Sequence, residues 1–121
     1  MKILYLPLKK KPYEMIEAGI KKEEYREIKP YWEKRLLDYG RLVEYVANNR
    51  DEIIVRRMLN MPIRNVCERF PRGYDAVCFS YGYTKRRMMF ECTGITIGQG
   101  RPEWLAPDCE TFIIKLGNRL Q

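Results

Sequence analysis

The sequence contains no histidine and no Cys-x-x-Cys pair. Without histidine, the chain lacks the commonest general base and the commonest metal ligand of proteins. Its four cysteines are isolated from one another along the chain: Cys67, Cys78, Cys92 and Cys109. No histidine can complete a zinc site with them, so the sequence predicts no metal site.

Long hydrophobic runs are also missing. No stretch approaches the roughly 20 apolar residues of a membrane span. The apolar run at residues 1–7 is too short for a signal peptide and is interrupted by Pro7. Cys78 and Cys92 lie in apolar, strand-like runs, where a free cysteine behaves as a small hydrophobic residue. We therefore expect a cytoplasmic protein with reduced thiols and no membrane partner.

Acidic residues are fewer than basic ones. Among 121 residues there are 23 Lys and Arg against 16 Asp and Glu, for a net charge of +7. This balance favours a polyanionic partner such as RNA, DNA or an anionic surface, although many small basic proteins have no such partner. The length is that of one domain, since single domains most often have about 100–150 residues.

Residues 12–26 combine a short helix with a highly charged strand. Pro12 suits the first turn of a helix over residues 12–18, and Gly19 suits the left-handed position just past its end. The charged residues that follow alternate between the two faces of an extended strand. Lys22, Glu24 and Arg26 share one face, and Lys21, Glu23 and Tyr25 share the other. Composition alone favours a solvated edge strand whose charges discourage pairing with another chain.

Gly19, Lys21, Glu24 and Arg26 match the pattern Gly-x-Lys-x-x-Glu-x-Arg. With this pattern, the segment resembles the signature of the ASCH domain family. Members of that family are similar in fold to PUA domains, which are small, partly open β-barrels with one or two helices and are generally proposed to bind RNA. The resemblance covers both ends of the chain and implies a single ASCH-like domain over residues 1–121. The implied fold is α+β, with a small PUA-like mixed β-barrel of five or six strands and flanking helices.

The middle third departs from the family, and we predict a helical insertion over about residues 36–70. Apolar residues at spacings of three and four predict an amphipathic helix here. These residues are Trp32, Leu36, Tyr39, Val43 and Val46. Gly40 weakens this helix, and a split into two helices at Gly40 is the alternative. Residues 52–60 suit a second helix, although the apolar run at residues 53–55 alone would suit a strand.

From residue 74 onward the pattern is that of β-strands. The alternation of apolar residues slips at Gly94, where a bulge would return Ile95 and Ile97 to the face that carries Met88 and Phe90. Closure of a barrel needs such bends. The last strand is predicted over residues 111–116, and residues 117–121 are expected to trail off.

Two basic clusters are candidate RNA contacts. The first cluster is at the start of the first helix and consists of Lys9, Lys10 and Lys11. Lysines at this position oppose the helix dipole, so helix stability does not explain them, and either a phosphate contact or solubility must. The hairpin loop at residues 81–87 mixes aromatic and basic side chains, which suits single-stranded or looped RNA. Its candidate contacts are Tyr83, Lys85 and Arg86. A merely solubilising hairpin tip is the alternative.

A long connection opens at Gly98 and Gly100 and runs to Glu110. The two glycines are not a dinucleotide fingerprint, because the third glycine is missing and Pro102 stands where a helix should start. No cofactor is therefore predicted. Connections of this length are often functional, and Trp104 would either cover the open end of the barrel or stack on a base.

We expect an RNA- or nucleotide-binding module with its ligand in a basic cleft beside the Gly-x-Lys-x-x-Glu-x-Arg motif. A bend after Gly19 would swing Lys21 toward the face of Glu24 and Arg26. Glu24 and Arg26 would then form a structural ion pair, so that loss of Glu24 lowers stability. Lys21 would be the ligand-facing cation, and Arg26 would contact phosphate or base beside it. Replacing Lys21 by alanine would spare stability and weaken binding.

The alternative function is a small hydrolase that acts on a modified nucleoside or on RNA. One branch similar to the family is an N4-acetylcytidine amidohydrolase that uses a lysine, a threonine and a glutamate. Lys21 matches the lysine, but Glu24 stands at the threonine position, so the hydroxyl nucleophile is absent. Glu91 is the candidate for the glutamate, and the acid–base pair requires both side chains in one pocket. Another branch is reported as ribonuclease, which no residue pattern here supports or excludes.

Overall fold

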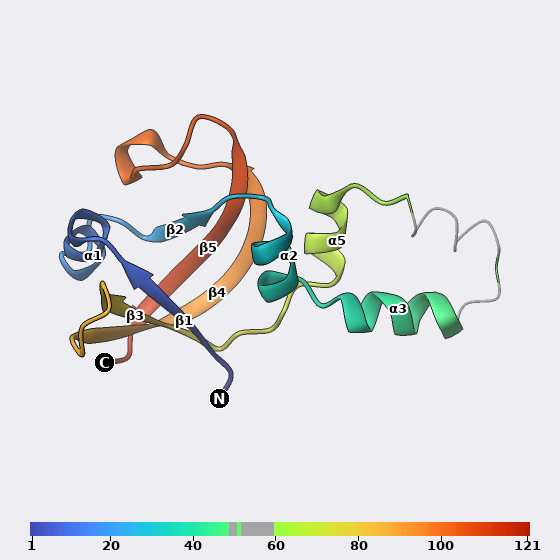
Figure 1. The fold of residues 1–121 in the computed structure, drawn as a ribbon, viewed down its shortest axis with the longest axis horizontal. Helices are drawn as coiled ribbons and strands as arrows, with labels where there is room; N and C mark the ends of the chain where they lie inside the picture. The colour runs from blue at the N-terminus through green and yellow to red at the C-terminus, as the bar shows by residue number, and fades with distance from the viewer. Residues whose placement is uncertain (49–50, 52–59) are drawn as a thin grey trace.

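The computed structural model describes residues 1–48, 51 and 60–121. Figure 1 shows its elements, which follow one another along the chain. They are β1 (Ile3–Leu8), α1 (Lys10–Glu17), β2 (Glu23–Arg26), α2 (Pro30–Leu36), α3 (Tyr39–Asn48), α5 (Ile63–Arg69), β3 (Ala76–Tyr81), β4 (Arg87–Gln99), the 3-10 turn η1 (Pro102–Trp104) and β5 (Glu110–Arg119).

The strands form one five-stranded sheet in the order β1-β3-β4-β5-β2. β1 and β3 are parallel, and the other neighbours are antiparallel. The sheet curls into a half-barrel, with β1 and β2 as its two edges (Figure 1). The predicted α+β class is confirmed, and the predicted mixed barrel is open along the seam between β1 and β2.

β4 contains the predicted irregularity. Its pairing register with β5 shifts between Phe90 and Cys92 and again between Cys92 and Gly94. Beyond the shifts, Ile95 and Ile97 join Phe90 in the hydrophobic core. The predicted bulge at Gly94 is confirmed, and such a bulge bends a strand so that it can follow the curve of a barrel.

β5 is longer than predicted. The sequence pattern predicts that this strand ends at residue 116, whereas β5 continues to Arg119. A Cβ atom at Gly117 would lie 2.8 Å from Oε2 of Glu91 on β4. A glycine inside a strand often marks such a close approach. Gly117 therefore continues the strand, and the prediction of a trailing end was wrong.

The helix predicted over residues 32–46 is two helices. Leu37 has extended backbone angles and forms an isolated bridge with Pro71. The backbone N–H of Asp38 donates to the Phe70 carbonyl at 2.7 Å. These pairings end α2 before α3 begins, and they join the two ends of the predicted insertion.

The insertion contributes unequally to the core. α3 projects away from the sheet in Figure 1, and none of its residues is buried. α5 packs against β4 through the buried Val66 and Cys67. The helix predicted over residues 52–60 falls on positions outside the described residues, apart from Asn60 in a turn.

The core lies between the half-barrel and its covering helices. Its largest fully buried side chains come from α1, from α2 and the residue after it, and from four of the strands: Leu6, Tyr13, Ile16, Leu36, Leu37, Phe79, Met88, Phe112 and Ile114. Each buried side chain of this size stabilises the fold by about 1.5–3 kcal/mol. No helix in the described parts of the chain is long and apolar enough to cross a membrane.

Candidate functional site

The end of α1 fixes the position of the motif. Gly19 has a φ of 78°, a left-handed conformation that favours glycine. Its N–H donates to the Ile16 carbonyl at 3.0 Å, and the N–H groups of Ile20 and Lys21 donate to the Met15 carbonyl at 3.0 and 3.1 Å. The first two bonds form the Schellman arrangement of a helix C-terminus. The chain therefore bends just after Gly19, as predicted, and Lys21 lies against the helix end.

Lys21 is almost completely buried, with 2 % of its side chain exposed. Its ammonium lies 3.2 Å from Oε1 of Glu24 and donates to the Trp104 carbonyl at 2.6 Å. The Tyr25 ring centroid lies 4.9 Å from the same nitrogen. A buried ammonium needs such partners, because removing it from water costs several kcal/mol. The predicted swing of Lys21 toward Glu24 is confirmed, whereas its contact with a ligand stays a prediction.

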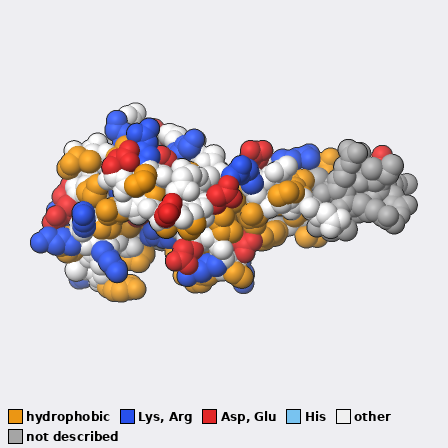
Figure 2. All heavy atoms as spheres, turned by 90° about the horizontal axis from the view of Figure 1, so that it is seen from above, with side chains coloured by type: hydrophobic (Ala, Val, Ile, Leu, Met, Phe, Trp, Pro, Cys, Tyr) orange, Lys and Arg blue, Asp and Glu red, His pale blue; other side chains and the backbone are white. Residues whose placement is uncertain are grey.

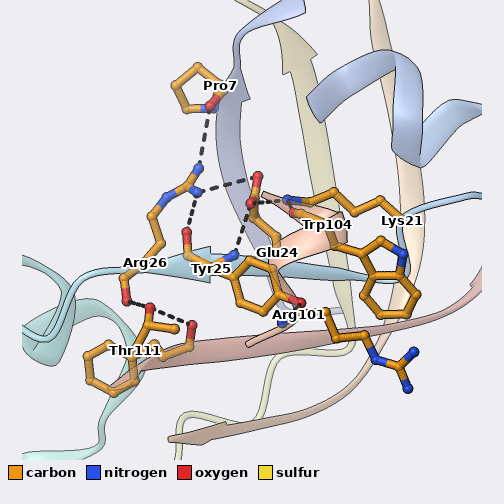
Figure 3. Close-up of polar contacts among 9 residues, drawn as sticks. Pro7, Lys21, Glu24, Tyr25, Arg26, Arg101, Trp104 and Thr111 are labelled. Carbon is orange, nitrogen blue, oxygen red and sulfur yellow. Dashed lines mark hydrogen bonds and ion pairs between the residues drawn. The ribbon is translucent and has the colours of Figure 1, made fainter. Parts of the chain in front are cut away.

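Glu24 lies between two cations, as Figure 3 shows. Oε1 contacts Lys21, and Oε2 lies 3.4 Å from Nη1 of Arg26. The Glu24 residue is only 4 % exposed. The predicted solvated edge strand is therefore wrong in part. β2 is an edge strand, but Lys21 and Glu24 are buried and paired because the helix end and the β4–β5 connection pack over them.

The motif also completes the hydrogen bonding of the open edge of β2. β2 has β5 as its one neighbour in the sheet. The Tyr25 N–H donates to Oε1 of Glu24 at 2.9 Å, and the Tyr25 carbonyl accepts from Nη1 of Arg26 at 2.8 Å. A buried backbone group left without a partner would cost about 1–3 kcal/mol. Glu24 and Arg26 therefore replace the contacts that a further strand would make.

Arg26 spans the seam of the half-barrel. Nη2 of Arg26 donates to the carbonyl of Pro7 on β1 at 3.5 Å, and Figure 3 shows this contact reaching across to the other edge strand. Its guanidinium also lies 5.1 Å from the ring of Trp32 on α2. Pro7 has no N–H to leave unpaired, which suits an edge strand. The motif thus links both edges of the sheet to α2.

The β4–β5 connection packs on the Tyr25 side of β2. The Arg101 N–H donates to the Tyr25 hydroxyl at 3.2 Å. Gly100 approaches so closely that a Cβ atom there would lie 2.5 Å from the Tyr25 ring. Burial raises the pKa of the Tyr25 hydroxyl, and the hydrogen bond from Arg101 acts in the opposite direction. The hydroxyl is therefore neutral at physiological pH.

Trp104 contacts the motif through its backbone carbonyl, which accepts from Lys21. Its indole is partly exposed and lies 4.6 Å from the guanidinium carbon of Arg101. The structure therefore brings Trp104 to the motif. Base stacking and covering of the barrel end both stay predictions for its ring.

A surface cleft of about 410 Å³ opens beside Lys21, between the end of α1 and the end of β5. We call it the signature cleft. Its described lining residues are Ile16, Gly19, Lys21, Lys22, Phe90, Leu116, Gly117, Asn118 and Arg119. None of these is acidic, and Lys22, Asn118 and Arg119 are exposed. The cleft therefore combines buried apolar side chains with exposed cationic and amide groups.

Glu91 does not share this cleft with Lys21. Successive side chains of a strand alternate between its faces, so Glu91 lies on the face of β4 opposite Phe90. Its Oε2 accepts from the Asn118 N–H at 3.4 Å, and Glu91 is absent from the described lining of the cleft. The Lys21 ammonium is held by Glu24 instead. No ion pair between Lys21 and Glu91 is found among the described residues, so nothing in the structure supports the predicted acid–base pair.

The other predicted contacts lie along α1, with three lysines at its start and the hairpin loop beside the helix. The Gly82 N–H donates to the Leu8 carbonyl at 2.7 Å, which brings the hairpin loop beside the exposed lysines. Those lysines are Lys9, Lys10 and Lys11.

The hairpin side chains differ in their surroundings. Tyr83 is 98 % exposed, and Lys85 is exposed as well. Nη2 of Arg86 instead donates to both carboxylate oxygens of Glu17 at 2.8 and 3.0 Å. The Arg86 guanidinium also lies 5.2 Å from the Tyr13 ring of α1. Arg86 therefore anchors the hairpin to α1, whereas Tyr83 and Lys85 extend into solvent.

Three cleft residues were missed as site residues from sequence: Lys22, Asn118 and Arg119. The predicted end of the last strand at residue 116 leaves Asn118 and Arg119 in a tail. No local signal distinguishes a glycine that ends a strand from one that packs against its neighbour. The alternation of the predicted strand placed Lys22 with Glu24, but it could not show which residues face a cleft.

Net charge alone does not mark a binding face. Figure 2 shows Lys and Arg side chains spread over the visible surface and interspersed with acidic ones. Comparisons of the chain with models of protein families, with curated proteins and with solved structures found no match. Fold and site together define an α+β protein with an open half-barrel, whose seam contains a buried cation–anion–cation cluster.

Proposed function

We propose that this protein is an RNA- or nucleotide-binding module of the ASCH and PUA-like type, which binds its ligand in the signature cleft. The observation that carries the proposal is the make-up of this cleft. Lys22 and Arg119 supply exposed cations, Asn118 supplies an exposed amide, and no described lining residue is acidic. Cations of this kind contact phosphates, while amides and apolar surfaces contact bases.

Residues of the motif form part of the wall of this cleft. Gly19 and Lys21 belong both to the Gly-x-Lys-x-x-Glu-x-Arg pattern and to the cleft lining. The Lys21 ammonium is almost completely buried and already contacts the Trp104 carbonyl, Glu24 and the Tyr25 ring, so a ligand reaches it less readily than an exposed cation. Lys22 and Arg119 are exposed, so they are the first phosphate contacts in this proposal.

Exposed residues at the start of α1 and on the hairpin beside it extend the proposed RNA surface. Lys9, Lys10, Lys11, Tyr83 and Lys85 lie there without a described ion-pair partner. An RNA strand that follows α1 would contact both ends of the helix, whose eight residues span about 12 Å.

The test is a titration of a fluorescently labelled pool of short RNAs, followed by anisotropy at about 50 and 200 mM salt. We expect binding at the lower salt and a marked loss at the higher one. The double substitution Lys22→Gln and Arg119→Gln should weaken binding by about tenfold or more and make it less sensitive to salt, because phosphate contacts are lost.

Lys115→Gln is the matched control. Lys115 is an exposed lysine on β5, the same strand as Arg119, and does not line the cleft. The Lys115→Gln variant should bind RNA as tightly as the unchanged protein does. Absence of binding at low salt would refute the proposal, and so would an equal loss in Lys115→Gln, which would indicate attraction to net charge alone. The hydrolase alternative has no observation in its favour, because Lys21 and Glu91 do not form a pair.

A further inference from the structure

A second cavity, of about 430 Å³, lies on the surface next to α2. Tyr31, Lys34 and Arg35 of α2 line it together with Arg72 and Tyr74, which precede β3. We call this cavity the tyrosine–arginine pocket. It shares no described lining residue with the signature cleft, and no residue of the Gly-x-Lys-x-x-Glu-x-Arg motif lines it.

Contacts to backbone carbonyls hold the wall of this pocket in place. Nε of Arg72 donates to the carbonyls of Lys34 and Leu37 at 3.2 and 3.0 Å. The Tyr74 hydroxyl donates to the Arg35 carbonyl at 2.7 Å. Burial raises the pKa of the Tyr74 hydroxyl, although the charges of Arg72 and Arg35 act in the opposite direction. The hydroxyl therefore keeps this hydrogen bond at neutral pH, and the wall needs little ordering before a ligand binds.

Three cations meet here without a carboxylate. In the part of the chain that the structure describes, Lys34, Arg35 and Arg72 form no ion pair, and no acidic residue lines the pocket. Arg86 at the hairpin, by contrast, is paired with Glu17. Like charges held close together repel one another, and an anion bound among them relieves this repulsion. The terminal nitrogens of Arg72 make no described contact and provide a fork that suits phosphate oxygens.

Aromatic surface lies beside these cations. Tyr31 is 55 % exposed, and the guanidinium carbon of Arg35 lies 4.4 Å from its ring centroid. Tyrosine rings and guanidinium planes are the surfaces on which nucleic-acid bases stack. A volume near 430 Å³ falls within the range of about 300–1,000 Å³ that is usual for small-molecule sites.

We propose that the tyrosine–arginine pocket binds a nucleotide, with its phosphate on Lys34, Arg35 and Arg72 and its base on Tyr31. The nucleotide is either a free mononucleotide or one unit of an RNA strand, since both present the same phosphate and base. This site does not depend on ligand binding in the signature cleft, because the two share no described residue.

The test is NMR spectroscopy of the full chain labelled with ¹⁵N and titrated with AMP, adenosine or inorganic phosphate. We expect AMP to shift the backbone amides of Tyr31, Arg35 and Tyr74 in a saturable manner. Adenosine and inorganic phosphate should each bind about tenfold more weakly, because each lacks half of the contacts. Titration with an oligoadenylate that has no terminal phosphates shows which form of nucleotide the pocket prefers. Tighter binding than AMP indicates that the ligand is part of an RNA strand, and weaker binding indicates a free mononucleotide.

Lys34→Gln and Arg35→Gln should each weaken AMP binding by about five- to tenfold, since each removes a charged phosphate contact. Both variants keep the backbone carbonyls that hold the wall. Lys29→Gln is the matched control, because Lys29 is exposed, precedes α2 and does not line the pocket. Its AMP affinity should be unchanged.

This proposal would be overturned if AMP shifted no amide of the pocket, if inorganic phosphate bound as tightly as AMP, or if Lys29→Gln lost as much affinity as Lys34→Gln. Amide shifts confined to Lys22, Asn118 and Arg119 would also overturn it, but they would support ligand binding in the signature cleft. The experiment therefore distinguishes failure of this proposal from failure of the proposed function.

Discussion

A lysine and a glutamate almost excluded from water lie 3.2 Å apart in the motif, and a partly buried arginine shares the same carboxylate. Removing such ions from water costs several kcal/mol each, and their attraction offsets this only when further hydrogen bonds complete the geometry. The Trp104 carbonyl completes it for Lys21, and the Tyr25 N–H completes it for Glu24. The charges of the motif therefore have a structural role. The sequence predicted this role for Glu24 and Arg26, but not for Lys21.

Replacing Lys21 by Met tests this role. Methionine keeps most of the apolar stem but removes the cation, which leaves Glu24 buried with Arg26 as its remaining ionic partner. We expect the free energy of unfolding in urea to fall by about 3 kcal/mol, the cost of breaking a buried pair. This reverses the expectation from sequence that loss of Lys21 spares stability. Glu24→Gln should lower stability as well, because it leaves two cations without their partner.

Lys29→Met is the control for this measurement. Lys29 pairs with Glu27 at 3.6 Å, but both side chains are more than half exposed. Exposed pairs contribute about 0–1 kcal/mol, so this variant should unfold almost as the unchanged protein does. A Lys21→Met protein as stable as Lys29→Met would show that the buried cluster adds nothing to folding.

At the scale of elements, the β4–β5 connection stabilises β2 by packing against Tyr25. Gly100 is the contact point, because a Cβ atom there would lie 2.5 Å from the Tyr25 ring and 2.6 Å from Cβ of Ala106. The connection also provides the carbonyl that accepts from Lys21. One glycine therefore determines how closely the connection covers an edge strand.

Gly100→Ala should consequently lower the free energy of unfolding by about 1–3 kcal/mol, the usual effect of forcing an extra carbon into a packed site. Urea titration followed by tryptophan fluorescence would measure it, since Trp104 lies in the same connection. Gly73→Ala is the matched control, because a Cβ atom at Gly73 would meet nothing within 4 Å. Equal stability of the two variants would contradict the close packing of this connection.

Elements with local signals could be predicted from the sequence. The helix end at Gly19 and the bulge at Gly94 were predicted correctly, because backbone freedom and two-residue alternation act over a few neighbouring residues. The break at Leu37 was missed, since it depends on a bridge to Pro71. The continuation of β5 was missed because it depends on Glu91 of another strand.

The same distinction applies to the sites. The sequence showed that Lys21 could turn toward Glu24, but its burial depends on Trp104, 83 residues away. The tyrosine–arginine pocket joins α2 to residues 72–74 through contacts between distant segments. Local patterns identified the charged residues, whereas non-local packing decides which of them remain exposed.

At the scale of the whole molecule, α5 is the described helix that ties the predicted insertion to the half-barrel. Its Cys67 is 0 % exposed, and the Cys67 thiol donates to the Ile95 carbonyl of β4 at 3.4 Å. Ile95 belongs to the same core as Phe112 and Ile114 of β5. Continuous burial from α5 to β5 predicts that the helix and the sheet unfold together as one cooperative unit.

The thiol of Cys67 reports on this cooperativity through pH. Burial raises its pKa from 9.0 to about 11, and the charge of Glu68 acts in the same direction. Between these two values the folded protein keeps a proton that the unfolded chain releases, so rising pH favours unfolding. The stabilisation by the neutral thiol is complete below pH 9 and is lost as the pH rises toward 11. Two pKa units correspond to about 3 kcal/mol at most.

We therefore expect the free energy of unfolding to fall more in the unchanged protein than in Cys67→Ala between about pH 8 and about pH 10.5. Urea unfolding of both proteins at each pH would measure this difference. All other titratable groups are common to both proteins and cancel in the comparison. Cys109→Ala is the control, because Cys109 is exposed, and it should follow the unchanged protein. Equal losses of stability in the unchanged protein and in Cys67→Ala would contradict this cooperativity. They would mean that α5 separates from the sheet before global unfolding. The Cys67 thiol would then already be exposed, and it would add no pH dependence to the unfolding of the half-barrel.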